Sequence, residues 1–413
     1  MHTAVRRALQ LRFAPALLTR QAWRQLPFVA LFALTACRPH DFPQYPPNYR
    51  EYVYVTNGDS GTVSIYDVVN LRLDRELAVG VHPVAVAPNS TRNEVYIVNQ
   101  GQSGASGSVS VLDAEHNAVV ATIPVRRQPV AIALDPAGSF AYVANSASNN
   151  ISVVDLKARR EVGVIPVSLQ PAALRVAPDG KSLVVANRRG DSVSILDPVT
   201  RTVRAVFPGC PGASDVVILP DSSKAFAACS AGHQIMAIAL ARFPANSAGH
   251  SATESPDAPH QLPDRVESLL DVGHGPVQLA LKPDGGELFT MNSLSDTISE
   301  VVTSTDDVGG AYLIGAEPVY GVVTADNALL YVGNLRSQWV TIYSIDDGKR
   351  AGAVHVGDGP AAMAFSADSH LLFVVDARSN DVAAVRTFDH SLFTLLPAGR
   401  APNAIADKAF KLP

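Results

Sequence analysis

The chain has 413 residues, of which 47% are hydrophobic and 17% are charged, and its formal net charge is −5. This apolar content is typical of a globular protein with a large core and excludes a disordered chain. The acidic balance argues against a general nucleic-acid binder.

Residues 1–36 have the composition of an export signal. They carry five arginines and no acid, and residues 26–36 are apolar and stop immediately before Cys37. A basic segment followed by a short apolar segment and small residues is typical of a cleavable signal peptide. Eleven apolar residues are too few to span a bilayer as a helix.

Residues 34–37 read Leu-Thr-Ala-Cys, which resembles a bacterial lipobox. The resemblance implies cleavage before Cys37 and lipid attachment to it, with the outer membrane favoured because Arg38 follows; the alternative is an ordinary secretory signal. Removing residues 1–36 leaves 28 basic against 38 acidic residues, a net charge of −10. Residues 37–50 contain four prolines and predict an extended tether between membrane and domain.

From residue 51 onward one motif recurs eight times. The copies have the form Tyr-Val-Thr-Asn and occupy residues 54–57, 96–99, 142–145, 184–187, 226–229, 289–292, 331–334 and 373–376. The last residues of successive copies are separated by 42, 46, 42, 42, 63, 42 and 42 positions. A period near 42 built from short apolar strands and turns is typical of a four-stranded propeller blade.

Each repeat reads as four strands without a sustained helical period. In the fourth copy the strands are residues 171–177, 183–187, 193–196 and 203–207, with a Pro-Asp-Gly turn after the first. The first copy lacks a preceding strand, and residues 401–406 form a strand without a following partner. The sequence therefore predicts an all-β closed propeller over residues 51–413, in which the first three strands and the last strand share a blade. This count gives eight blades, with seven as the alternative.

The 63-residue gap holds an insertion between the third and fourth strands of the fifth blade. Residues 242–265 are rich in Pro, Ser and Ala and predict a mobile loop. A smaller Gly/Ser-rich insertion at residues 101–107 lies on the end of the ring where the motif copies finish.

Two cysteines remain in the mature chain. Cys229 replaces the motif asparagine in the fifth copy, and Cys210 lies at the start of the strand beside it. Because export leads to an oxidising compartment, we expect a disulfide that stabilises the fold by about 3 kcal/mol. The alternative is a pair of buried free thiols.

The motif, the spaced proline and the Val-Ser-Val-Ile-Asp segments resemble the YVTN-type β-propeller repeat family, whose members include surface-layer and quinoprotein-like propellers. The resemblance covers residues 50–410 and implies the fold; it implies little about function, since such propellers include binding scaffolds, dehydrogenase subunits and lactonase relatives. The motif asparagine and the aspartate that ends the third strand are interpreted as turn-stabilising residues. We expect neither a metal site nor a cofactor.

Function is expected where the repeat is broken at the end of the channel that the motif copies reach. Charged or aromatic residues fall there in an otherwise acidic protein, and their arginines predict an anionic ligand or partner. The candidate residues are His82, Arg127, Arg188, Arg189, His274, Glu317, Arg336, Trp339, Asp358, Arg378 and Arg400. His82 and His274 belong to blades four apart, across the channel. The alternative is that these are solvated loop residues.

No catalytic motif stands out, so the leading hypothesis is a monomeric, non-enzymatic, lipid-anchored propeller of the cell envelope that binds a protein, a glycan or a small anion. A second hypothesis is a lactonase-like hydrolase using His82 or His274 with Arg400 and Glu317. A third is an accessory propeller of redox or haem metabolism.

Overall fold

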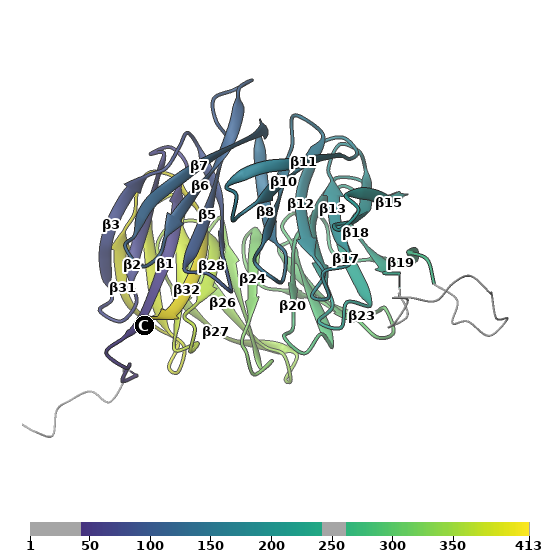
Figure 1. Cartoon of the computed structure of the whole chain (residues 1–413). Coiled ribbons are helices and arrows are strands. Elements are labelled where there is room, and N and C mark those ends of the chain that lie inside the picture. The colour runs from purple at the N-terminus through teal and green to yellow at the C-terminus, as the bar shows by residue number, and fades with distance from the viewer. Residues whose placement is uncertain (1–42, 242–261, 413) are drawn as a thin grey trace, which may run out of the picture. The chain divides into compact units, whose positions relative to one another are not determined.

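The computed structural model describes residues 43–241 and 262–412. The signal sequence, Cys37 and most of the predicted mobile loop lie outside these residues. The chain from Asn48 onward forms one compact unit. It consists of eight four-stranded antiparallel sheets arranged as blades around an axis, and no helix occurs in the described part (Figure 1).

The first four blades, I to IV, contain sixteen strands. Blade I holds β32 (Pro402–Lys411), β1 (Tyr49–Asn57), β2 (Thr62–Asp67) and β3 (Arg72–Ala78). Blade II holds β4 (Pro83–Pro88), β5 (Glu94–Asn99), β6 (Ser106–Asp113) and β7 (Ala118–Arg127). Blade III holds β8 (Pro129–Leu134), β9 (Phe140–Asn145), β10 (Asn150–Asp155) and β11 (Arg160–Pro166). Blade IV holds β12 (Pro171–Val176), β13 (Leu183–Asn187), β14 (Ser192–Asp197) and β15 (Thr202–Pro208).

Blades V to VIII complete the ring. Blade V holds β16 (Ala213–Ile218), β17 (Lys224–Cys229), β18 (Gln234–Ala239) and β19 (Arg265–Asp271). Blade VI holds β20 (Pro276–Leu281), β21 (Glu287–Asn292), β22 (Thr297–Val302) and β23 (Asp307–Leu313). Blade VII holds β24 (Pro318–Val323), β25 (Leu329–Asn334), β26 (Trp339–Ser344) and β27 (Lys349–His355). Blade VIII holds β28 (Pro360–Phe365), β29 (Leu371–Asp376), β30 (Asp381–Arg386) and β31 (Ser391–Pro397).

The ring is closed, as the sequence predicted, and the count of eight excludes the seven-bladed alternative. The innermost strands of all neighbouring blades contact one another, including β28 with β32 and β32 with β4. In blade I, β32 pairs with β1 along nine register positions, from Tyr49 opposite Lys411 to Asn57 opposite Pro402. Residues near the two ends of the described chain therefore complete one sheet.

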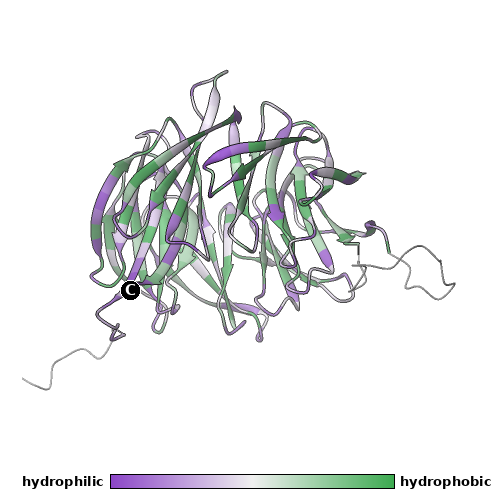
Figure 2. Cartoon of the chain, viewed as in Figure 1, coloured by the Kyte–Doolittle hydropathy of each residue, from purple (hydrophilic) through white to green (hydrophobic). Residues whose placement is uncertain are grey.

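Burial follows strand position within each blade. The second strands lie between two neighbouring sheets, so they are buried on both faces; β13 is buried at all five of its residues. The fourth strands face outward and are exposed or half-buried at most of their residues, as in β3. Figure 2 shows hydrophobic stretches along the strands around the ring and hydrophilic residues along β3 and at many turns. Apolar burial between adjacent sheets is the main stabilising contribution in such a ring.

The chain enters every inner strand in the same unusual way. The residue immediately before the strand has a positive φ in all eight blades: His82, Gln128, Gln170, Gly212, Gly275, Glu317, Gly359 and Ala401. The register then shifts within the first residues of the inner strand, which marks a β-bulge. The left-handed residue therefore turns the chain from each outer strand into the channel wall.

The motif asparagine bonds differently from the expected turn contact. Instead of bonding mainly within its own turn, its amide reaches the third strand: Asn57 Nδ2 donates to Ser64 Oγ at 2.9 Å and to Thr62 Oγ1 at 3.1 Å. In all six blades with the asparagine, a hydroxyl of the third strand accepts from the amide, seven residues later in five blades and eleven residues later in blade II, where the turn carries an insertion: Ser64, Ser110, Ser152, Ser194, Ser299 and Thr341. Blades V and VIII lack the asparagine, and they carry Met236 and Ala383 at the position of the hydroxyl. The amide thus ties the second strand to the third.

The link from one blade to the next packs directly on this amide. A Cβ added at Gly80 would lie 2.6 Å from Asn99 Cγ, and one at Gly315 would lie 2.4 Å from Asn334 Oδ1. Glycine is required at these two positions because the backbone of the link and the buried asparagine side chain occupy adjoining space.

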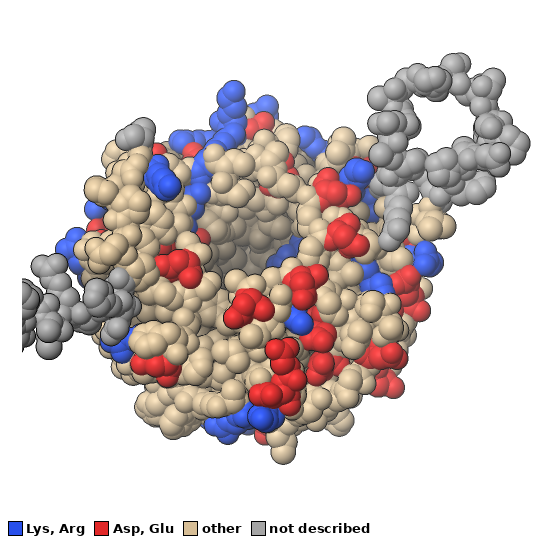
Figure 3. All heavy atoms as spheres, turned by 90° about the horizontal axis from the view of Figure 1, so that it is seen from below, with Lys and Arg blue, Asp and Glu red and all other residues tan. Residues whose placement is uncertain are grey.

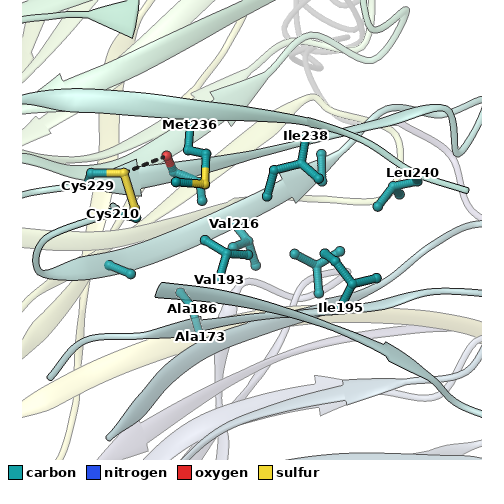
Figure 4. Packing of buried hydrophobic residues seen from close by; sticks show 14 residues of the cluster. Ala173, Ala186, Val193, Ile195, Cys210, Val216, Cys229, Met236, Ile238 and Leu240 are labelled. Atoms are coloured by element: carbon teal, nitrogen blue, oxygen red, sulfur yellow. Dashed lines mark hydrogen bonds between the residues drawn. A yellow bond between two sulfur atoms is a disulfide. The ribbon is translucent and has the colours of Figure 1, made fainter. Parts of the chain in front are cut away.

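Blade V replaces the amide with a covalent bond. Cys210 and Cys229 form a disulfide with a Cα–Cα distance of 4.7 Å. Both residues are fully buried beside Met236 in a cluster that joins blades IV and V (Figure 4). The bond therefore joins Cys229, at the motif position of the second strand, to Cys210 in the link before the blade, where blades II and VII carry Gly80 and Gly315.

Candidate ligand-binding site

Two kinds of loop meet at one end of the ring, which we call the motif face. The turns between second and third strands begin after the motif, and the links between blades end at the inner strands. Because the strands are antiparallel, both kinds of loop emerge at the same end. The predicted site residues all belong to these loops or to the strand ends beside them. Figure 3 views the opposite face, which is hollowed at its centre and carries acidic side chains on one side of the hollow.

Three of the predicted residues border two adjoining pockets on the motif face of blades I to III. His82 lines both pockets, which have volumes of about 800 and 280 Å³. Arg400 lines the larger pocket and Arg127 the smaller one. The inserted loop contributes Gly101, Gln102 and Ser103 to both. The pockets therefore form where an insertion interrupts the regular repeat.

His82 and Arg400 are held by the turn that follows the first motif copy. His82 Nδ1 lies 2.8 Å from the Gly58 carbonyl oxygen and 3.8 Å from an Asp59 carboxylate oxygen. Arg400 Nη2 donates to the Asp59 carbonyl oxygen at 3.3 Å, and its N–H donates to Ser60 Oγ at 2.8 Å. Arg400 keeps donors free for a ligand, since an arginine has five N–H groups.

The inserted loop is tied to the backbone around His82. The Gln100 N–H donates to the His82 carbonyl oxygen at 2.9 Å, and the Gly101 N–H donates to the Val81 carbonyl oxygen at 3.0 Å. Arg127 Nη2 donates to the Ala147 carbonyl oxygen at 3.5 Å, at the far wall of the smaller pocket. The loop thus fills the space between two cationic positions with glycines and neutral polar side chains.

Other predicted arginines are neutralised within their own blade. Arg336 Nε lies 2.5 Å from Glu317 Oε2, and Arg378 Nη1 lies 3.8 Å from Asp358 Oδ1. These pairs join a turn to the link beside it. Half-exposed ion pairs of this kind contribute little to stability, but they lower the net positive charge of the rim in blades VII and VIII.

The remaining predicted residues lie apart from the two pockets. Arg188 and Arg189 in blade IV have no ion-pair partner among the described residues. His274 does not point toward His82: it stacks on His233 with ring centroids 4.4 Å apart. Trp339 is 45% exposed and meets His355 edge-on at 5.0 Å.

The third-strand aspartates make the turn contacts that were expected of them. Asp197 Oδ1 accepts from the Val199 and Thr200 N–H groups at 2.8 and 2.9 Å, and Asp155 Oδ1 accepts from Ala158 N–H at 2.8 Å. Within the ranges 43–241 and 262–412, no three His, Cys, Asp or Glu side chains gather closely enough to hold a metal ion. The same ranges contain no helix suited to cross a bilayer.

The sequence patterns did not single out Asp59, Gln100 or Gln128, which also border the pockets. The sequence could have revealed these three residues, because each lies within three residues of a motif end or an inner-strand start. Four polar residues of the inner strands were missed as well: Arg175, Asp215, Gln278 and Tyr320. Aligning the residues two and four positions after the inner-strand start would reveal them.

Comparison with known proteins identifies the fold. Residues 109–246 match the YNCE-like beta-propeller family. No curated protein matches the sequence. Three solved structures have similar folds. Dihydro-heme d1 dehydrogenase NirN in complex with DHE gives a TM-score of 0.67 at 16% identity, covering 89% of this chain and 76% of that one. A lactonase-like protein from Bacteroides uniformis gives a TM-score of 0.57 at 15% identity, covering 87% of this chain and 100% of that one. Kuenenia stuttgartiensis hydrazine synthase gives 0.54 at 20% identity, covering 74% and 95%.

These identities are too low to indicate a shared activity, so the similarity concerns the fold. The family match covers the middle of the chain, and the ring of eight sheets extends the same architecture to both ends of the described part. The chain is therefore an eight-bladed β-propeller, similar over residues 109–246 to the YNCE-like β-propellers.

Proposed function

We propose that the protein is a non-enzymatic binding protein, lipid-anchored through Cys37 in the cell envelope, which holds an anionic ligand or an acidic group of a partner on its motif face. The observation that carries this proposal is the pair of pockets around His82, Arg127 and Arg400. Cations at both ends of a neutral polar loop suit a ligand with carboxylate, sulfate or phosphate groups.

The charge of the rest of the molecule favours the same interpretation. The mature chain has a net charge of −10, so cations beside a pocket stand out against an acidic background. Among the described residues, the guanidinium groups of Arg127 and Arg400 donate only to carbonyl oxygens, whereas those of Arg336 and Arg378 face carboxylates. A ligand anion would therefore not have to displace an internal acid at the first two positions.

The test is equilibrium binding of the purified mature protein to heparin and alginate oligosaccharides and to inorganic phosphate. A charge-assisted hydrogen bond contributes about 1.5–3 kcal/mol, so Arg127→Ala and Arg400→Ala should each weaken binding by about ten- to a hundredfold. Arg188→Ala is the matched control, because Arg188 is a motif-face arginine outside both pockets. Equal loss in all three variants would show that the pockets are not the site.

The lactonase-like alternative has less support. Glu317, which that hypothesis requires, pairs with Arg336 and borders neither pocket. Asp59 is the carboxylate near His82, at 3.8 Å. Hydrolysis of a sugar lactone that disappears in His82→Ala would favour an enzyme over a binding protein. A Soret band in the purified protein would instead favour the haem-related alternative.

A further inference from the structure

A second break in the repeat lies inside the channel. Two positions after the start of each inner strand, five blades have alanine: Ala85, Ala131, Ala173, Ala362 and Ala404. Blades V, VI and VII instead carry Asp215, Gln278 and Tyr320. Two residues further along, every blade has alanine or valine except blade IV, which has Arg175. The four exceptions therefore come from four successive blades.

Two of these residues connect neighbouring inner strands. Asp215 is 8% exposed, and its Oδ2 accepts from the Leu279 N–H of β20 at 3.1 Å. Gln278 Oε1 accepts from the Gly321 N–H of β24 at 2.9 Å, while its Nε2 donates to the Leu279 carbonyl oxygen at 2.9 Å. Their polar atoms are thus engaged by the wall itself, and they hold blades V, VI and VII in fixed positions.

Arg175 has donors to spare. Its Nη1 donates to the Leu174 carbonyl oxygen at 3.0 Å, and its Nη2 lies 3.8 Å from Asp215 Oδ1. The side chain is 51% exposed although it belongs to an inner strand. Since a guanidinium has five N–H groups in a planar fork, an unused edge remains toward the channel. Asp215 orients this edge.

Tyr320 supplies a second donor. Its side chain is half-buried, and among the described residues its hydroxyl makes no hydrogen bond. Burial raises the pKa of Tyr320, Arg175 opposes the rise and Asp215 adds to it, so the hydroxyl lies within electrostatic range of both. A phenol in a protein interior usually has a hydrogen-bond partner, and here a ligand can be that partner.

We propose that the channel wall binds a small monocarboxylate, with the guanidinium of Arg175 gripping the carboxylate and the Tyr320 hydroxyl donating to it. A planar carboxylate matches the guanidinium fork. The Asp215 carboxylate already neutralises part of the Arg175 charge, which disfavours a dianion such as phosphate. The alanines and valines at the equivalent positions of the other inner strands have short side chains, which suits a ligand with a small apolar body.

This site is separate from the rim pockets of blades I to III and goes beyond the proposed function. The experiment is calorimetric titration of the mature protein with acetate, propionate, benzoate and inorganic phosphate. We expect at least one monocarboxylate to bind at about 1 mM or tighter, and phosphate to bind more weakly. Arg175→Gln should abolish this binding, and Tyr320→Phe should weaken it about tenfold, as expected for one charge-assisted hydrogen bond.

Tyr320→Phe keeps the Arg175–Asp215 contact and thereby separates ligand binding from folding, which thermal unfolding of each variant checks. Arg127→Ala and Arg400→Ala are the controls and should bind the carboxylate as the parent does. The proposal is overturned if no monocarboxylate binds, if phosphate binds more tightly, or if Tyr320→Phe and Arg175→Gln bind like the parent.

Discussion

Asp376 shows how one atom changes the behaviour of a repeated position. It occupies the motif position that is asparagine in six other blades, and it is fully buried. Its Oδ2 accepts from the Gly357 N–H at 2.9 Å, while its Oδ1 has no partner among the described residues. Burial raises the pKa of Asp376 to about 8; the Gly357 N–H opposes the rise, and the neighbouring Asp381 adds to it.

The consequence is a pH-dependent stability. In the unfolded chain an aspartate titrates near about 3.9, so between that pH and about 8 the folded protein holds a proton that the unfolded chain releases. The free energy of unfolding should therefore fall as pH rises through this window. Asp376→Asn should remove this part of the slope and raise stability at pH 8 by a few kcal/mol, on the order set by the linkage relation. Urea unfolding between pH 5 and 9 measures it.

The matched control is Asp346→Asn, which removes a charge from an exposed turn and should leave the slope unchanged. The double variant Asp376→Asn/Ala383→Ser should gain more stability than the single variant, because it restores the hydroxyl that accepts a hydrogen bond from the asparagine amide in six other blades. A single variant with the parent's pH slope would show that Asp376 does not hold the proton. Asp407, whose pKa burial raises to about 9, contributes its own slope, so the comparison is between variant and parent.

At the scale of the hairpin, blade V has a disulfide and lacks the asparagine–hydroxyl hydrogen bond found in six other blades. With Met236 at the position of the hydroxyl, an asparagine at 229 would lack its main acceptor, and the disulfide instead ties Cys229 of β17 to Cys210 in the link before β16. We expect Cys210→Ser/Cys229→Ser to lower the free energy of unfolding by about 3 kcal/mol, since the closed loop spans 19 positions. Thermal unfolding of the oxidised parent and of the double variant measures the loss.

Reducing the parent with dithiothreitol should reproduce the loss, while the double variant should not respond to the reductant. A parent that unfolds at the same temperature with and without reductant would show that the bond does not stabilise this blade.

The elements themselves were predictable, because the period near 42, the proline and the motif mark each strand and turn locally. The third-strand hydroxyl that follows each asparagine was also visible in the aligned repeats. Side-chain direction in the loops was not. Blade count placed His82 and His274 opposite each other, but His274 stacks on His233, and Glu317 turns toward Arg336. Such contacts depend on the conformation of the links, which positive φ angles set. Histidine and glutamate rarely adopt a positive φ, so the sequence does not predict this conformation at His82 or Glu317.

At the scale of the whole molecule, the ring depends on β32. Thr56 Oγ1 donates to Asn403 Oδ1 at 2.6 Å, and Asn403 Nδ2 donates to the Pro83 carbonyl oxygen at 3.0 Å, so this strand joins blades I and II as well as completing a sheet. Deleting residues 400–413 exposes the inner edge of β1 and the core beside it. We expect loss of cooperative unfolding and a marked drop in thermal stability.

Differential scanning calorimetry tests this, with a nick by limited proteolysis within residues 242–261 as the comparison, because that cut leaves β18 and β19 intact. Parent-like unfolding of the truncated chain would contradict the role assigned to β32.

The lipid anchor proposed at Cys37 is tested on the whole molecule. If Cys37 carries the lipid, Cys37→Ser should move the protein from the membrane fraction to the soluble fraction, since little else on an acidic domain attracts it to an anionic surface. Fractionation followed by immunoblotting measures the shift, and Cys210→Ser/Cys229→Ser should stay with the membrane. Membrane retention of the Cys37→Ser protein would rule out this anchor.

The pairing of β1 with β32 also sets an order of events during biosynthesis. β1 is synthesised before the other described strands, and it lacks its inner neighbour until β32 has been made. Until β32 has been made, a nascent chain therefore exposes the unpaired inner edge of β1, an edge at which another unfinished chain can pair.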